Sequence, residues 1–183
     1  LNPRGYRTEL AYTPTYELDT LINAEGHSVA FDYDPNKNLV GRVDARGVAA
    51  SFEFDELDRV IRRVQNAMDG MPADFQTNVV TELVYDLAGN LRELVNPRNY
   101  VAEFRYDPAH RRVMLIDFEG GETSFSYDRV DNLLEAVDAE GNPTRYEYDA
   151  LDRLIGTINA ESEITAYQYD PMGNRIGMVA PDG

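Results

Sequence analysis

The sequence predicts an all-β protein, an antiparallel meander of short β-hairpins that forms one curved sheet. Three observations predict this fold. A Tyr-Asp dipeptide returns at a fixed interval of 21 residues, hydrophobic and polar residues alternate before each dipeptide, and turn-forming residues fill the gaps between the alternating runs. A pattern that recurs at constant spacing is typical of a structural unit that stacks on its neighbours.

The repeat is defined by the aromatic residue of each dipeptide, which we call the mark residue. Successive mark residues lie 21 positions apart, except that Phe54 and Tyr85 lie 31 apart. The ten extra residues predict a lengthened turn near residues 66–76, inserted into a single array of about eight units that spans residues 1–183. The mark residues are Tyr12, Tyr33, Phe54, Tyr85, Tyr106, Tyr127, Tyr148 and Tyr169.

Each unit contains two predicted strands. In "TRYEYD" (residues 144–149), Tyr146 and Tyr148 occupy one face of a strand and charged residues occupy the other. The next run, "LIGTIN" (residues 154–159), predicts a second strand in which Leu154 and Ile158 share a face. The segment "ELDRVIRRVQNAM" (residues 56–68) comes closest to helical spacing, but it is in register with the strands of the other units. We therefore expect strand there as well.

The width of the sheet predicts its curvature. Two strands in each of about eight units would give a flat sheet roughly 75 Å wide, at about 4.8 Å per strand. Open sheets seldom exceed about 10 strands without curling or splitting. Because one face is aromatic and aliphatic, the sheet is expected to curl around an interior, fold back as two layers, or pair with another copy. Exposed sheet edges also predict self-association of the isolated chain.

Composition excludes several classes of function. The formal net charge of −16 argues against binding to nucleic acid or to anionic membrane surfaces, because both would repel the chain. The absence of Cys excludes disulfides and thiolate zinc sites. No apolar stretch approaches the roughly 20 residues of a membrane span. No glycine-rich phosphate loop or other cofactor motif is present, so no cofactor is expected.

An Asp follows seven of the eight mark residues, and two interpretations account for it. A ladder of carboxylates could bind Ca²⁺, and "DYDPNKN" (residues 32–38) begins like an EF-hand loop. It fails at the sixth position, where Lys37 replaces Gly, and at the twelfth, where Val43 replaces Glu. We therefore expect each Asp to accept hydrogen bonds from backbone N–H groups of the following turn, with no metal. The residues are Asp34, Asp55, Asp86, Asp107, Asp128, Asp149 and Asp170.

The aromatic residues also have two interpretations. They could form a stacking platform for sugars, but their regular spacing on the apolar side favours a packed ladder of cross-strand neighbours. The insertion is the one stretch that repetition does not explain. Met68, Met71 and Phe75 therefore form a candidate binding loop for a glycan or a cell surface.

Candidates for catalysis are few. His27 and His110 occupy turn positions that many residue types fill in the other units, so neither position demands an imidazole. No nucleophile motif and no metalloprotease motif occurs. With no distinctive acid–base pair, a glycan-cleaving enzyme is the remotest alternative, and no catalytic residue is predicted.

At these positions the sequence resembles the YD repeats of the Rhs family. The matching stretches are "YDLAGNL" (residues 85–91), "YDALDRL" (148–154) and "YDPMGNR" (169–175). The resemblance extends from Tyr12 to the end of the chain. It implies a strip of β-sheet that spirals into a hollow shell, as in bacterial polymorphic toxins, insecticidal toxin-complex C subunits and teneurins.

The resemblance also sets the expected function. In the toxins of this family the shell encloses a C-terminal toxic domain, so the chain is expected to be a non-catalytic segment of a secreted or surface-displayed bacterial shell. Its expected partners are the rest of that shell and its cargo. Family members also carry an aspartyl self-cleavage site marked by an Asp-Pro-x-Gly-Leu-like stretch. "DPMGNR" (residues 170–175) lacks the Leu, so neither a protease nor a toxin is assigned to this chain.

Overall fold

The protein is built from antiparallel β-strands in a computed structural model that describes residues 7–67 and 76–181. These ranges contain sixteen strands and no helix. The predicted all-β meander is therefore confirmed. It includes a strand at Val60–Ala67, within the segment whose hydrophobic spacing comes closest to that of a helix. Among the described residues there is no helix long and apolar enough to cross a membrane.

The chain divides into two compact units, Leu1–Val101 and Ala102–Gly183. The first contains β1 (Glu9–Tyr12), β2 (Leu18–Ile22), β3 (Ser28–Tyr33), β4 (Leu39–Val43), β5 (Ala49–Phe54), β6 (Val60–Ala67), β7 (Val79–Tyr85) and β8 (Leu91–Val95). The second contains β9 (Val101–Tyr106), apart from its first residue, and β10 (Arg112–Ile116), β11 (Glu122–Tyr127), β12 (Leu133–Val137), β13 (Pro143–Tyr148), β14 (Leu154–Ile158), β15 (Ile164–Tyr169) and β16 (Arg175–Val179).

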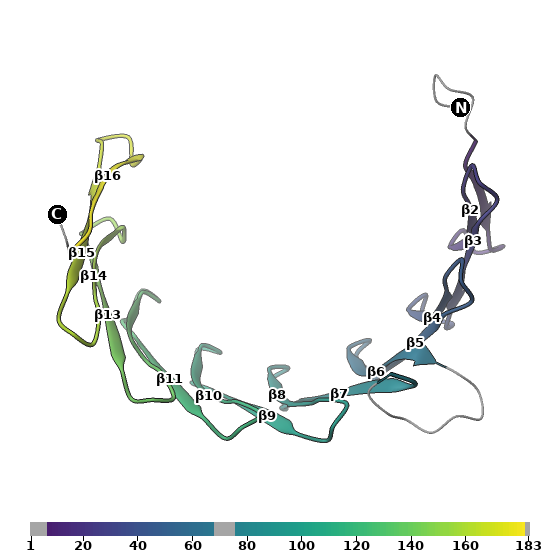
Figure 1. The fold of residues 1–183 in the computed structure, drawn as a ribbon, viewed down its shortest axis with the longest axis horizontal. Coiled ribbons are helices and arrows are strands. Elements are labelled where there is room, and N and C mark those ends of the chain that lie inside the picture. The colour runs from purple at the N-terminus through teal and green to yellow at the C-terminus, as the bar shows by residue number, and fades with distance from the viewer. Residues whose placement is uncertain (1–6, 68–75, 182–183) are drawn as a thin grey trace. The chain divides into compact units, whose positions relative to one another are not determined.

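Each unit is a single layer of strands. Within a unit every strand pairs antiparallel with its neighbours in the sequence and contacts no other strand. Within each unit the sheet bends progressively along its strand order (Figure 1). Neither unit folds back as two layers, and among the described hydrophobic residues only Val64 and Ala102 are buried. The mark residues from Tyr33 to Tyr169 are partly buried, whereas Tyr12 is exposed.

Two kinds of turn alternate along each sheet. We call the turn that follows a mark residue a Tyr-Asp turn, and the turn at the opposite end of the strands a return turn. Because consecutive strands run antiparallel, all Tyr-Asp turns of a unit lie along one edge of its sheet and all return turns lie along the other. We call these the Tyr-Asp edge and the return edge.

A β-bulge at every Tyr-Asp hairpin changes which residues share a face. In β13 and β14, Tyr146 is opposite Thr157, but Tyr148 is opposite Leu154, because the register shifts between them. Directly opposed residues lie on the same face, so Leu154 and Thr157 share the face of the tyrosines. Ile158 therefore lies on the other face. The prediction that Leu154 and Ile158 share a face is wrong, because simple alternation does not include the extra bulge residue.

The hairpin that carries the insertion has the longest strands. β6 has eight residues and β7 has seven. The backbone N–H of Asn78 donates to the carbonyl of Asn66 at 3.0 Å, and both residues have positive φ, which Asn tolerates better than most residues. The candidate binding residues Met68, Met71 and Phe75 lie outside the described residues.

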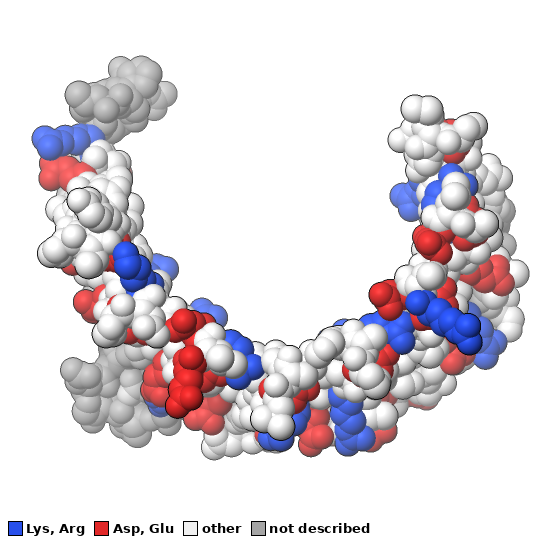
Figure 2. Space-filling view, turned by 180° about the vertical axis from the view of Figure 1, so that it is seen from behind, with Lys and Arg blue, Asp and Glu red and all other residues white. Residues whose placement is uncertain are grey.

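Charges of both signs cover the surface. Figure 2 shows acidic and basic side chains next to one another on the face that it presents. The chain has 33 acidic and 17 basic residues, so the mixture is acidic overall. An acidic surface of this kind favours solubility and disfavours association with anionic partners.

Candidate functional site

The Asp of each Tyr-Asp pair begins a tight turn, and its side chain holds that turn closed. In the turn that begins at Asp107, Oδ1 accepts hydrogen bonds from the N–H groups of Ala109 at 2.9 Å and Arg111 at 3.1 Å. The N–H of Asp107 also donates to the carbonyl of Arg111 at 2.9 Å. Equivalent Oδ1 contacts occur at Asp34, Asp55, Asp86, Asp128, Asp149 and Asp170. The Asp carboxylate is thus part of the turn backbone's hydrogen bonding.

The residue four positions after each mark residue has positive φ. This left-handed residue follows a type I turn and returns the chain to the next strand. Its φ is 64° at His110 and 90° at Gly89. The shared property of this position is its backbone conformation, because its side chains differ in size and charge. Its members are Tyr16, Lys37, Asp58, Gly89, His110, Asp131, Asp152 and Gly173.

The residue four positions after the Asp links one repeat to the next. Arg111 donates from Nε and Nη2 to Oδ2 of Asp107, at 2.8 and 2.7 Å. Its Nη1 reaches the following turn, where it donates to the carbonyl of Asp128 at 2.6 Å and to Oδ1 of Asp131 at 2.9 Å. The guanidinium carbon lies 4.9 Å from the centre of the Tyr127 ring. One side chain therefore closes its own turn and holds the neighbouring one.

Other repeats make this link with Arg or with Asn. Arg59 stacks on Tyr85 at 4.5 Å, and Arg153 stacks on Tyr169 at 4.9 Å. Asn132 uses its amide instead, because Nδ2 donates to Oδ2 of Asp128 at 2.9 Å and to Oδ1 of Asp152 at 3.0 Å. Asn38 makes the same pair of contacts with Asp34 and Asp58. The identity of the residue changes, but the link is retained.

The first repeat carries the same link with the charges reversed. Thr13 replaces the turn Asp, and its Oγ1 accepts a hydrogen bond from the N–H of Glu17 at 3.1 Å. Glu17 occupies the linking position, and its Oε1 lies 2.6 Å from Nζ of Lys37, which is the left-handed residue of the next turn. The Lys37 ammonium, followed by the hydroxyls of Thr13 and Thr15, lowers the pKa of Glu17 from 4.5 to about 2.

The hydroxyls of the mark tyrosines make a third kind of link. Tyr85, Tyr127 and Tyr169 donate to the carbonyls of Val60, Arg112 and Leu154 at 3.0, 2.9 and 2.8 Å. Each carbonyl belongs to the preceding repeat and lies beside its β-bulge. Bulges interrupt the regular ladder, and each Tyr hydroxyl supplies a donor to a carbonyl at that interruption.

The causes of the pKa shifts differ between the two edges. In the Tyr-Asp turns, the Arg side chain is the largest cause that lowers the pKa of Asp55, Asp107 and Asp149. In the return turns, the backbone N–H groups of Val48 and Asn142 are the largest causes for Asp44 and Asp138. The pKa values of Asp55, Asp107 and Asp149 therefore depend chiefly on a linking Arg side chain, whereas those of Asp44 and Asp138 depend chiefly on backbone N–H groups of their own turns.

The predicted site residues form a ladder of contacts rather than a convergent pocket. Within residues 7–67 and 76–181, no three His, Cys, Asp or Glu side chains are grouped to hold a metal ion. The oxygens of the turn Asp residues are already occupied by N–H donors. The arrangement can fix backbone geometry and register, and the described residues offer no distinctive acid–base pair.

Sequence analysis missed a second turn-closing position. In six of the eight repeats it lies eleven residues after the mark residue and begins the return turn. Oδ1 of Asp138 accepts from the N–H groups of Glu140 and Asn142 at 3.0 and 2.8 Å, as in a Tyr-Asp turn. A count of Asn and Asp at that spacing would have found it. The other members are Asn23, Asp44, Asn96, Asp117 and Asn159.

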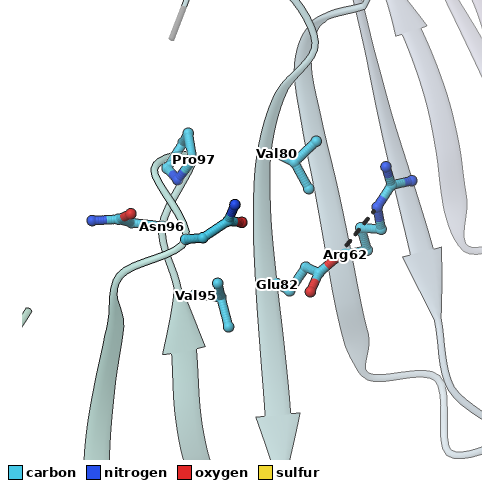
Figure 3. A pocket seen from close by; sticks show the side chains of 7 residues that line it. Arg62, Val80, Glu82, Val95, Asn96 and Pro97 are labelled. Carbon is cyan, nitrogen blue, oxygen red and sulfur yellow. Dashed lines mark ion pairs between the residues drawn. The ribbon is translucent and has the colours of Figure 1, made fainter. Parts of the chain in front are cut away.

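A small pocket lies beside the long hairpin in the first unit. Its volume is about 230 Å³, and Figure 3 shows Arg62, Glu82 and Asn96 around it. The Nε of Arg62 lies 3.8 Å from Oε1 of Glu82. Val80, Val95, Pro97 and Asn99 complete the lining. The pocket combines donors, acceptors and a short apolar surface.

The fold and the ladder together define the class of protein. A single-layer β-meander whose turns are tied from repeat to repeat is a structural β-repeat protein. The family model for the Teneurin YD-shell matches residues 4–137, and that for the RHS Repeat matches residues 127–164. The first match covers more than half of the chain. The chain therefore belongs to the Teneurin YD-shell family, and the predicted membership among Rhs and YD-repeat proteins is confirmed.

Solved structures agree on the fold. A chain in the crystal structure of TcdB2-TccC3 aligns with 97% of this chain at a TM-score of 0.55 and 14% sequence identity. A chain in the crystal structure of TcdB2-TccC3-TEV aligns with 97% at a TM-score of 0.50 and 14% identity. In both comparisons this chain spans only 13% of the other chain's length. None of the curated proteins matches the chain.

Proposed function

We propose that this chain forms a wall segment of a hollow β-shell that encloses a C-terminal toxin or other cargo, and that it performs no catalysis. The observation that carries the proposal is the ladder along the Tyr-Asp edge. Side chains that recur in successive repeats are committed to closing a turn or holding the next hairpin. Membership of the Teneurin YD-shell family supports a wall-forming role.

The partners of this segment would be the rest of the parent shell and the cargo that it encloses. The Rhs resemblance supports a bacterial protein that is secreted or displayed on the cell surface. The array of residues 1–183 would act as one continuous strip. Self-association of the isolated chain remains a prediction, and sedimentation over a range of concentrations tests it.

Limited proteolysis of the full-length gene product tests the enclosing role. We expect segments outside residues 1–183 that are held inside the shell to resist a protease while the wall is intact. The substitution Tyr127→Ala should expose them, because it removes a ring and a hydroxyl that tie two repeats. Tyr100→Ala, in a return turn, serves as the matched control. Cleavage of those segments in the unmodified protein at the rate of an unfolded chain would contradict enclosure.

Glycan or cell-surface binding is the second candidate function. The pocket beside Arg62 supports it, since it adjoins the one hairpin that departs from the repeat and offers charged and amide groups to a sugar. A glycan array tests it with two variants, Arg62→Ala and Phe75→Ala. Reproducible binding that both variants abolish would favour this candidate, and an array without reproducible binding would remove it.

A further inference from the structure

Two arginine side chains on strands of the first unit have no partner among the described residues. Arg42 lies on β4 and Arg63 lies on β6, and both are exposed. Most basic side chains in residues 7–67 and 76–181 contact a carboxylate or an aromatic ring, whereas neither of these does. Because the chain has 33 acidic and 17 basic residues, a shortage of carboxylates does not explain the difference.

Strand pairing places the two arginines beside one pocket. Arg42 is directly opposite Ala50, and Ala50 is opposite Gln65 on the following strand. Phe52, two residues after Ala50, is opposite Arg63. All five side chains therefore lie on one face of the sheet. The arginines are two strands apart, about 9.6 Å, and are displaced by about 6.8 Å along the strands. All five residues line the same pocket, whose volume is about 220 Å³.

The one acidic residue that lines this pocket already has its donors. Oδ1 of Asp44 accepts from the N–H groups of Arg46 and Val48 at 2.9 and 3.0 Å, and Oδ2 lies 3.2 Å from Nη2 of Arg46. The guanidinium groups of Arg42 and Arg63 thus keep donors that no described acceptor fills, and an anion would supply the acceptors. The charge of Asp44 and the net charge of −16 disfavour a multiply charged anion. A ligand with a single negative charge therefore fits best.

The rest of the lining favours a ring beside the charge. Its apolar members are Leu39, Val48, Ala49, Ala50 and Phe52, and all of them are partly buried. The ring of Phe52 offers a flat surface against which another ring can pack. The volume is several times the roughly 30 Å³ that one water molecule occupies in the liquid, so a carboxylate group alone would leave most of the pocket unfilled.

We propose that Arg42 and Arg63 bind a small ligand that carries one carboxylate on a ring. The carboxylate accepts hydrogen bonds from both guanidinium groups, and the ring lies against Phe52. An aromatic acid and a sugar acid share this chemistry. The site is separate from the pocket beside Arg62, because Arg62 and Arg63 are consecutive in a strand and point to opposite faces. Its role goes beyond wall formation, since it uses none of the contacts that tie one repeat to the next.

The experiment titrates isotope-labelled protein, residues 1–183, with five probes at neutral pH and constant ionic strength. Benzoate and glucuronate carry the carboxylate, benzamide and glucose are their neutral counterparts, and inorganic phosphate tests a different anion. NMR signals of the arginine Nε–H groups measure the affinity of each probe. We expect at least one carboxylate to bind about fivefold or more tightly than its neutral counterpart. Tighter binding of benzoate would identify an aromatic acid as the ligand, and tighter binding of glucuronate would identify a sugar acid.

Variants separate the paired site from general attraction to positive charge. We expect Arg42→Gln and Arg63→Gln each to weaken the preferred carboxylate about tenfold, because each removes a charged donor. Arg98→Gln is the matched control. It removes the same charge from an exposed return-turn arginine of the same unit, whose side chain also has no described partner. It should change binding less than about twofold. Circular dichroism checks that the variants retain the sheet.

Several outcomes would overturn the proposal. If neither carboxylate gave a saturable change, or if each bound no better than its neutral counterpart, the pocket would not recognise the charge. Tighter binding of phosphate than of both carboxylates would show a general anion surface. Equal losses in Arg98→Gln and Arg63→Gln, or no loss in Arg42→Gln, would show that the two arginines do not act as a pair. None of these results bears on wall formation, which the proteolysis experiment tests separately.

Discussion

An Asp side chain closes the turns at both edges of the sheet in the same way, but its second oxygen has a different partner at each edge. Asp107 at the Tyr-Asp edge and Asp138 at the return edge both close a turn through Oδ1. They differ in what binds Oδ2. In Asp107 it binds Arg111, which continues into the next repeat, whereas in Asp138 it binds Asn142 of the same turn at 3.1 Å. Local turn closure and coupling between repeats are therefore separable functions of one residue type.

The residues that fill the two positions follow this difference. Three of the return turns begin with Asn, at residues 23, 96 and 159. The described Tyr-Asp turns, in contrast, begin with Asp wherever the linking residue is Arg or Asn. An Asn side chain supplies the single acceptor that turn closure requires. Holding a linking Arg or Asn needs a second oxygen that accepts from its N–H groups, which a carboxylate provides and an Asn amide does not. Coupling in a repeat protein depends on such nearest-neighbour contacts, and here they concentrate on one edge.

Loss of a ring from the Tyr-Asp edge should give the largest effect. Tyr127→Ala removes the stacking surface of Arg111 and the hydrogen bond to the carbonyl of Arg112. We expect the free energy of unfolding to fall by about 2 kcal/mol, less than for a fully buried aromatic because Tyr127 is only partly buried. Tyr100→Ala, at the return edge, should cost less than about 0.5 kcal/mol. Urea denaturation followed by circular dichroism measures both, and equal losses would refute the contrast between the edges.

Replacement of Asp by Asn should give the second-largest difference in stability between the two edges. Asp107→Asn retains Oδ1 for the turn but replaces the acceptor of Arg111 with an amide group. Asp138→Asn recreates the residue type already present in other return turns. We expect a clear fall in thermal midpoint for Asp107→Asn and almost no change for Asp138→Asn. Thermal unfolding of the two variants side by side is the measurement. A larger fall for Asp138→Asn would mean that the second carboxylate oxygen has no special role at the Tyr-Asp edge.

The hydroxyl link can be tested by removing it and by adding it. Tyr127→Phe keeps the ring and should cost about 1 kcal/mol, because the carbonyl of Arg112 loses its partner. Phe54 is the one mark residue without a hydroxyl, so Phe54→Tyr offers the reverse experiment. Its hydroxyl would reach toward the carbonyl of Leu39, the equivalent residue of the preceding repeat, and should stabilise the protein by about 0.5–1 kcal/mol. A destabilised Phe54→Tyr would indicate that the bulge carbonyls do not need this donor.

Sequence pattern predicted the hairpins and their turns because both depend on local chemistry. The 21-residue interval, the alternating aromatics and the turn Asp residues each act within a few positions. The face of Ile158 was missed because a bulge residue interrupts alternation, and nothing in the local pattern of "LIGTIN" signals it. The link from Arg111 to Asp131 was also missed, since it joins residues 20 positions apart and becomes visible only when the strands are paired. The return-turn position is also a local feature, because Asn or Asp recurs there at the same spacing from the mark residue.

Acid should affect the two edges for different reasons. Folding lowers the pKa of Glu17 from 4.5 to about 2, and the largest cause is Lys37 of the next repeat. Its contribution to stability is therefore fully present above pH 4.5 and is lost as the pH falls toward about 2. The pKa of Asp44 is lowered chiefly by the N–H of Val48 in its own turn.

Substitution of the neighbouring repeat separates these two causes. In Lys37→Gln, we expect the pKa of Glu17 to rise toward its ordinary value, since the ammonium is gone, while the pKa of Asp44 stays where it is. NMR titration of the side-chain carboxyl carbons measures both groups in one sample. The effect on stability should be the smallest considered, because Lys37 is largely exposed and solvent screens its charge. If Glu17 titrated identically with and without Lys37, the first repeat would not share the ladder, and coupling along the Tyr-Asp edge would begin only at Asn38.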